Sequence, residues 1–147
     1  MPRLSDKSLL AIAAVVDVAL HARGAPVAAK ALAARHELPP RHLEPVLQAL
    51  VHAGVLKGVR GPRGGYELAR ERRRITVAEV VRVVEAEGEE ALEGFPPIVR
   101  DIVQPAVADA ERAFETALDG VTVEDLCRAA AQNTLRKGLP EGIDFTI

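Results

Sequence analysis

The chemistry that stands out in this 147-residue chain is positive charge gathered in one short segment. Between residues 57 and 74 seven side chains are basic and two are acidic, which gives a local net charge of +5. The seven are Lys57, Arg60, Arg63, Arg70, Arg72, Arg73 and Arg74. The whole chain carries −2, so the other residues together carry −7. Such an asymmetry is typical of a surface that binds a polyanion, and a basic hairpin beside an amphipathic helix suits nucleic acid better than a membrane.

The elements around the basic segment follow the order helix, hairpin, helix. Apolar residues recur at helical spacing from Leu43 to Val51, which leaves a polar free face on a helix that starts near residue 41. Residues 55–59 and 66–69 are expected to be strands, because the turn formers of residues 60–65 leave a hairpin as the economical connection. Thr76 then starts a closing helix with four valines on its inner face.

Two more helices are expected before this unit, ending near Gly24 and near His36. Leu38-Pro39-Pro40 forces a turn after the second one, because a residue that precedes proline avoids the helical region. Three helices, a two-stranded wing and a closing helix make a winged helix-turn-helix. The sequence therefore predicts a mainly α fold in which residues 1–86 form a winged-helix DNA-binding domain.

The segment after the winged helix is acidic and is expected to face away from DNA. Residues 85–125 hold twelve acidic and two basic side chains. Residues 87–104 are expected to be a linker and sensor loop, 105–135 a helical dimerisation region, and 136–147 a tail. A stripe at heptad spacing would pair with its symmetry mate, or alternatively pack against its own winged helix. Its members are Val107, Ala110, Phe114, Ala117 and Val121.

Residues 38–74 resemble the signature of the IscR, NsrR and CymR family of bacterial winged-helix regulators, also called the Rrf family. The resemblance rests on Leu43-Glu44, Ala53-Gly54, Arg60-Gly61-Pro62 and Gly64-Gly65-Tyr66. It implies a homodimeric transcription factor, usually a repressor, that binds a palindromic operator in double-stranded DNA. The third helix would enter a major groove and the wing the adjoining minor groove. The residues expected to contact DNA are Arg41, His42, Glu44, Gln48, Lys57, Arg60, Arg63 and Arg72.

Members of this family that sense through an iron–sulfur cluster carry three cysteines before the long helix. Residues 87–104 contain none, and the chain has a single cysteine, Cys127. We therefore expect no iron–sulfur cluster and no other cofactor, although a dimer could share ligands between chains. Cys127 is expected to be a small core residue of a helix capped by Thr122, with a redox switch as the alternative. The four histidines lack metal-ligand spacing, so no metal site is expected.

Other classes of function find less support in the sequence. No nucleophile with a base and an orienting group can be assembled, so the chain is not expected to be an enzyme. It lacks an apolar run of about 18 residues and a signal-peptide pattern, so a cytoplasmic protein without membrane contact is expected. The alternative to a DNA-binding repressor is a winged-helix protein-interaction module with vestigial DNA binding. A small molecule or a protein could be the effector, and residues 94–98 are the loop where we expect a small molecule to bind. The alternative role for this loop is that Phe95 and Ile98 anchor the long helix to the domain.

Overall fold

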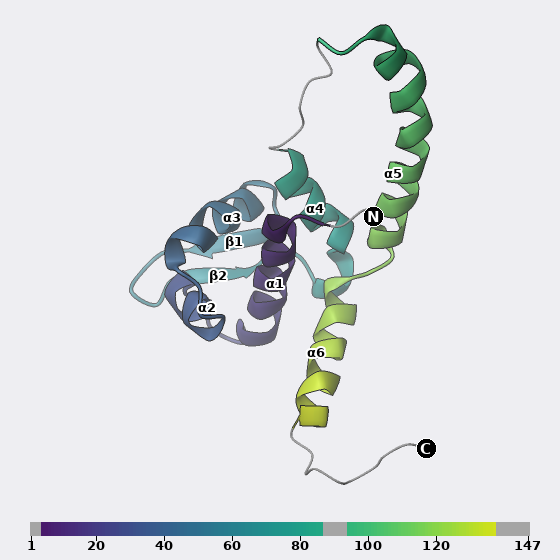
Figure 1. Cartoon of the computed structure of the whole chain (residues 1–147). Coiled ribbons are helices and arrows are strands. Elements are labelled where there is room, and N and C mark those ends of the chain that lie inside the picture. The colour runs from purple at the N-terminus through teal and green to yellow at the C-terminus, as the bar shows by residue number, and fades with distance from the viewer. Residues whose placement is uncertain (1–3, 87–93, 138–147) are drawn as a thin grey trace, which may run out of the picture.

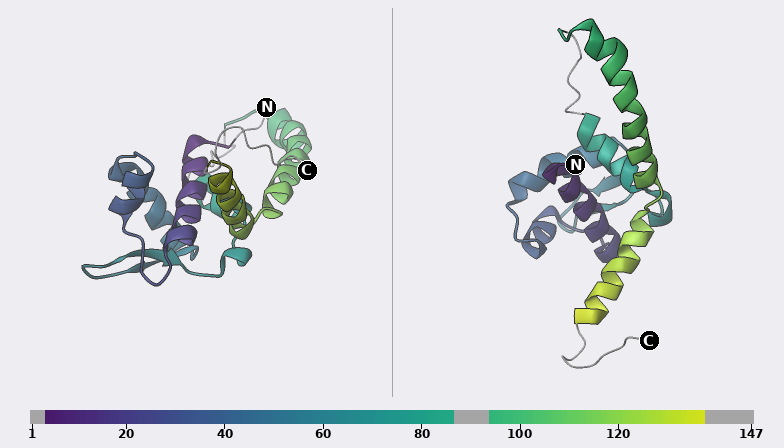
Figure 2. Two further views of the ribbon diagram at one scale, coloured as in Figure 1. Left: turned by 90° about the horizontal axis from the view of Figure 1, so that it is seen from below. Right: turned by 45° about the vertical axis from the view of Figure 1, so that its right-hand side comes forward.

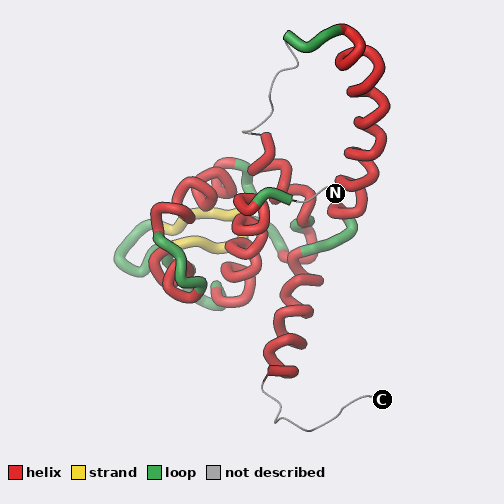
Figure 3. The backbone as a smooth tube through the Cα atoms, in the orientation of Figure 1, coloured by secondary structure: helices red, strands yellow, loops and turns green. Residues whose placement is uncertain are grey.

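The structure is a computed structural model that describes residues 4–86 and 94–137, with side chains described up to residue 133. Helices dominate, and the two short strands form one antiparallel hairpin (Figures 1 and 3). The elements are α1 (Asp6–His21), α2 (Ala29–Arg35), α3 (Pro40–His52), β1 (Leu56–Val59), β2 (Gly65–Leu68), the 3₁₀ turn η1 (Arg72–Arg74), α4 (Val77–Glu85), the π-helical turn η3 (Val99–Val103), α5 (Gln104–Asp119) and α6 (Val123–Lys137). This arrangement confirms the predicted winged helix-turn-helix.

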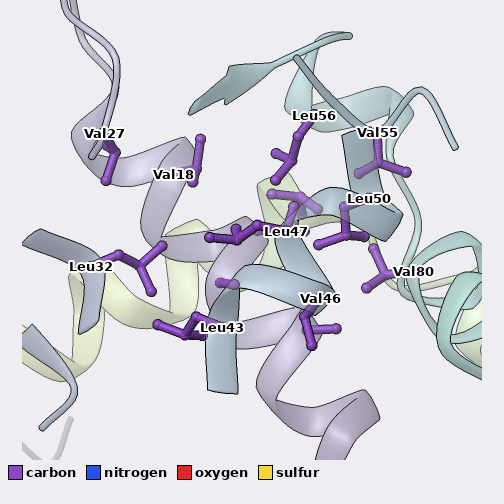
Figure 4. Close-up of a cluster of buried hydrophobic side chains, with 14 of the residues drawn as sticks. Val18, Val27, Leu32, Leu43, Val46, Leu47, Leu50, Val55, Leu56 and Val80 are labelled. Atoms are coloured by element: carbon purple, nitrogen blue, oxygen red, sulfur yellow. The ribbon is translucent and has the colours of Figure 1, made fainter. Parts of the chain in front are cut away.

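One apolar core holds the winged helix together. Leu43, Leu47 and Leu50 of α3 are fully buried because their spacing places all three on one side of the helix. They meet Val15 and Val18 of α1, and the base of the hairpin closes the cluster (Figure 4). The opposite side of α3 is thereby left facing solvent.

Besides this packing, a β-bridge joins the hairpin to the connection between α1 and α2. Val27, in the connection between α1 and α2, donates its N–H to the Tyr66 carbonyl at 2.9 Å and accepts from the Tyr66 N–H at 2.8 Å. A Cβ at Gly65 would lie 2.3 Å from the Val27 carbonyl oxygen, and one at Gly64 would lie 2.3 Å from that of Val59. Both positions therefore require glycine, which explains the two glycines of the Gly64-Gly65-Tyr66 motif.

A buried carboxylate fixes the end of α2, just before α3. Asp17 of α1 is 3% exposed and accepts from Arg35 Nε at 2.9 Å and from Arg35 Nη2 at 2.6 Å. His36 Nε2 lies 2.8 Å from the same carboxylate. Burial alone raises the pKa of Asp17, but the hydrogen bonds from Arg35 and His36 outweigh it and bring the pKa below its usual value. Our sequence reasoning missed this cluster.

The chain after the winged helix divides into two helices that lie along one side of the domain (Figure 2). The first turns of α6 belong to the winged-helix core, since Val123 and Cys127 are buried in it. Val121, the last member of the predicted stripe, lies beyond the end of α5, and its carbonyl accepts from the Val77 N–H at 2.8 Å. The predicted dimerisation region, residues 105–135, therefore also contacts its own winged helix, and its role in dimerisation stays a prediction. In the described part of the chain no helix is long and apolar enough to cross a membrane.

Candidate nucleic-acid interface

The exposed face of α3 carries the residues that the sequence analysis assigned to base or phosphate contact. Arg41, His42, Glu44 and Gln48 are all exposed, because the buried leucines occupy the other side of the helix. The four side chains offer a cation, an imidazole, a carboxylate and an amide, which are the groups that read base edges and phosphates in a major groove. Their contact with DNA stays a prediction.

The seven basic residues of residues 57–74 are not equivalent in the structure, although they count alike in the sequence. Five of the seven basic residues have an acidic neighbour, at distances of up to 4.0 Å. The pairs are Lys57 with Glu67, Arg70 with Glu79, Arg72 with Glu124, and both Arg73 and Arg74 with Glu71. Arg60 and Arg63, at the tip of the wing, have no ion pair with any residue that the structure describes. The uncompensated charge of the wing thus lies at its tip.

A groove of about 430 Å³ connects the exposed face of α3 with the wing. Gln48 of α3 and Arg60 of the wing both line it, and Tyr66 of β2 lies between the two elements. Gln48 Nε2 donates to the Tyr66 hydroxyl at 3.4 Å, a long hydrogen bond. The groove therefore brings two predicted DNA contacts onto one continuous surface, together with a tyrosine that our sequence reasoning did not assign.

Arg72 lies apart from this surface. It belongs to η1, which follows β2 at the end of the hairpin away from the wing tip (Figure 1). Its Nε donates to a carboxylate oxygen of Glu124 in α6 at 2.8 Å. The predicted set of DNA contacts implied that Arg72 lies on one surface with Arg60 and Gln48. The structure instead gives Arg72 an intramolecular partner and places it apart from those two residues.

Cys127 lies beside this ion pair, inside the core. It is 3% exposed, and burial raises the pKa of its thiol, an effect that the nearby Arg72 guanidinium partly opposes. A raised pKa disfavours the thiolate, the reactive form in redox sensing. Among the described residues no group of three histidine, cysteine or acidic side chains could hold a metal ion.

Four members of the predicted dimerisation stripe lie on α5, a helix without a buried residue, and one of them, Phe114, also lines a cleft between α5 and α4. Val107 is 45% and Phe114 38% exposed, and Ala110 and Ala117 are exposed as well. The apolar surface continues onto η3, where Ile102 is 65% exposed, which extends the stripe beyond the residues that heptad spacing had indicated.

The candidate effector loop lies at the start of this surface. Phe95 is 48% and Ile98 63% exposed, so neither side chain belongs to the buried core. Both roles considered for this loop, effector binding and anchoring of the long helix, stay predictions.

Comparisons with known proteins agree with this geometry. Residues 4–129 match the model of the Rrf2 family, described as iron-dependent transcriptional regulators. The HTH-type transcriptional regulator IscR of Xenorhabdus nematophila is 31% identical over 133 residues, which cover 86% of this chain and 79% of that protein. Among solved structures, the IscR of T. potens superposes with a TM-score of 0.70 at 29% identity, covering 96% of this chain and 94% of that one. CymR, the global cysteine regulator of B. subtilis, gives 0.67 at 30% identity, with 88% and 98% covered. The chain belongs to the Rrf2 family, and it is a transcriptional regulator with a DNA-binding helix-turn-helix.

Proposed function

We propose that the protein is a homodimeric repressor that binds a palindromic operator. In this proposal α3 enters a major groove and the tip of the wing enters the adjoining minor groove, while the acidic arm faces away from DNA. The observation that carries the proposal is the pair of uncompensated arginines at the wing tip, Arg60 and Arg63, of which Arg60 lines a groove together with Gln48 of α3. An arginine at the tip of a narrow wing suits the negative potential of a minor groove. Because bacterial DNA lies in the cytoplasm, the protein would act there.

The exposed apolar surface of the arm supports a dimer. Most helices in proteins are stabilised by packing of an apolar face, and α5, a helix of 16 residues, has no buried residue. Here that face is exposed from Ile98 to Phe114 in the single chain. A second copy that covers it would stabilise α5 and place two α3 helices about one helical turn of DNA apart, roughly 34 Å.

The family description raises the question of iron. The usual ligands of an iron–sulfur cluster are cysteine thiolates, and this chain has one cysteine, which is buried in the core with a raised pKa. These donors do not fit the cluster sites of the cluster-binding relatives. We therefore propose regulation without an iron–sulfur cluster, through a small molecule or a partner protein.

The proposal is tested by a gel-shift titration with the promoter region next to the protein's own gene. The full-length protein should shift this DNA at concentrations at least about a thousandfold below those for non-specific DNA of the same length. Equal affinity for the two DNAs would contradict sequence-specific binding and favour the protein-interaction alternative. Binding of the protein to the promoter should lower transcription in a reconstituted assay. A rise in transcription would show that the protein is an activator and not a repressor.

The dimer is tested separately by sedimentation equilibrium. The wild type should sediment as a dimer, and Val107→Glu, which puts a charge into the exposed stripe, should sediment as a monomer. A matched control is Asp109→Asn, on the same helix and outside the stripe. A monomeric wild type that still binds its operator specifically would contradict the dimer and leave the DNA-binding proposal standing.

A further inference from the structure

A cleft of about 740 Å³ separates α4 from the second half of α5. Apolar side chains cover most of its wall, chiefly Ala78, Val81, Phe114 and Leu118. Ligand pockets of proteins commonly measure about 300–1,000 Å³ and are mostly apolar. The cleft thus has the size and the lining of a small-molecule site, and it lies away from the proposed DNA-binding surface.

The two helices that form the cleft are joined at one end and diverge toward the other. Arg82 of α4 forms an ion pair with Glu115 of α5, and Thr76 Oγ1 donates to an Asp119 carboxylate oxygen at 3.0 Å. From this closed end α5 runs outward past the end of α4, as Figures 1 and 2 show. A molecule in the cleft would therefore contact both helices where they diverge.

The charges around the cleft favour a cation. Glu85 and Glu111 line it, and neither carboxylate has a cationic partner among the described residues. Glu85 instead accepts hydrogen bonds from the hydroxyls of Ser8, at 2.8 Å, and Ser5, at 3.1 Å. The one arginine in the lining, Arg82, is already paired. Two uncompensated carboxylates on an apolar cleft complement an apolar body that carries a positive charge.

We propose that this cleft binds amphipathic organic cations. The apolar part of the ligand packs on the alanine, valine and leucine side chains, and its positive charge lies near Glu85 and Glu111. Phe114, which lines the cleft, adds a cation–π contact of the kind that recognises quaternary cations. Because the ligand contacts both α4 and α5, its affinity depends on the angle between the two helices, which is the requirement for an effector.

The test uses two probes of the same shape and opposite charge, tetraphenylphosphonium and tetraphenylborate, in equilibrium dialysis with the full-length protein. The phosphonium should bind at least about tenfold more tightly than the borate. Glu111→Gln and Glu85→Gln should each weaken phosphonium binding by about two- to fivefold, the contribution of an exposed ion pair. Asp101→Asn, an exposed carboxylate of η3 outside the cleft, is the matched control and should have no effect.

A second variant tests the location of the site. Ala86→Trp places a bulky ring on an exposed position of the cleft wall and should abolish binding of the phosphonium, while circular dichroism shows the same helix content as the wild type. The proposal is overturned if the borate binds as tightly as the phosphonium, if the glutamate variants bind like the control, or if Ala86→Trp has no effect. It is also overturned if a dimeric wild type binds no phosphonium, because a second copy then fills the cleft. DNA is absent from these measurements, so their outcome is independent of the proposed binding to an operator.

Discussion

Arg72 at the base of the hairpin donates to Glu124 of α6 across 2.8 Å, and this ion pair joins two residues that are 52 positions apart in the chain. The Arg72 side chain is 35% exposed and that of Glu124 23%, so solvent screens the pair only in part. The contact connects the wing-bearing part of the domain with the helix that follows α5. Arg72, which the sequence analysis expected to contact DNA, thus has a partner within the protein.

We predict that Arg72→Ala lowers the free energy of unfolding by about 1 kcal/mol, the upper end for a partly screened ion pair, and leaves the salt dependence of DNA binding unchanged. Arg63→Ala, at the unpaired tip of the wing, should have the opposite profile: unchanged stability and a salt slope reduced by about one. Urea denaturation and DNA titrations at several salt concentrations measure both quantities. A reduced salt slope for Arg72→Ala without loss of stability would restore Arg72 as a phosphate contact.

We predict that Arg60→Ala weakens operator binding by roughly 1–3 kcal/mol, the range for one specific side-chain contact. The fold should be unaffected, because the Arg60 side chain is exposed and has no partner among the described residues. Fluorescence anisotropy with labelled operator measures the effect. Arg73→Ala is the control, since Arg73 is an exposed arginine at the base of the hairpin whose Nε bonds to Glu71 at 2.6 Å. Equal losses for both variants would mean that the tip has no special contact.

We predict that Glu44→Ala relaxes the base preference at one symmetric pair of operator positions. Glu44 is the fifth residue of α3, beyond the first turn, so its carboxylate gains little stabilisation from the helix dipole. Its substitution therefore mainly removes a hydrogen-bond acceptor. A carboxylate in a major groove accepts from the amino group of cytosine. Selection of binding sites from random DNA should give the same motif as the wild type except at that pair. An unchanged motif would leave Glu44 without a role in base reading.

The sequence predicted the parts of this fold that depend on local pattern. The spacing of Leu43, Leu47 and Leu50 was sufficient to place the exposed face of α3, and the turn formers between residues 60 and 65 were sufficient to place the wing. It could not predict contacts between distant segments. The Val27–Tyr66 bridge, the Asp17–Arg35 pair and the Arg72–Glu124 pair depend on the tertiary arrangement, which periodicity does not encode.

The same distinction applies to the candidate site. A count of charges treats all seven basic residues of the hairpin alike, whereas the fold gives five of them acidic neighbours and leaves the wing tip uncompensated. A buried aspartate within an apolar helix was visible as Val15-Val16-Asp17-Val18, and this pattern was the available signal for the cluster that fixes α2.

We predict that Asp17→Asn lowers the free energy of unfolding at neutral pH by about 2 kcal/mol. This value is below the 3–5 kcal/mol typical of a fully buried pair, because the Arg35 side chain is 35% exposed. The pKa of Asp17 is lower in the folded protein than in the unfolded chain, so its contribution is present above about pH 4 and is lost as the pH falls through the folded-state value. Urea denaturation between pH 3 and 7 should therefore show a steeper acid loss for the wild type than for Asp17→Asn. Asp101→Asn, which changes an exposed carboxylate, should retain the wild-type profile, and parallel profiles for wild type and Asp17→Asn would contradict the assignment.

We predict that Cys127 does not act as a peroxide switch. Its thiol is buried and its pKa is raised, and both properties slow oxidation, which requires an accessible thiolate. The thiol should react with a chromogenic disulfide reagent far more slowly in the folded protein than in urea. Cys127→Ser should lower stability by about 1–3 kcal/mol, because it places a hydroxyl in an apolar site, and it should retain operator binding. Titration of operator binding with and without peroxide then separates the alternatives: release of DNA by the oxidised wild type, together with resistance of Cys127→Ser, would make Cys127 a redox switch despite its burial. Identical binding curves for both proteins, with and without peroxide, would leave the buried thiol with a packing role in α6, where it lies beside the Arg72–Glu124 ion pair that ties this helix to the winged domain.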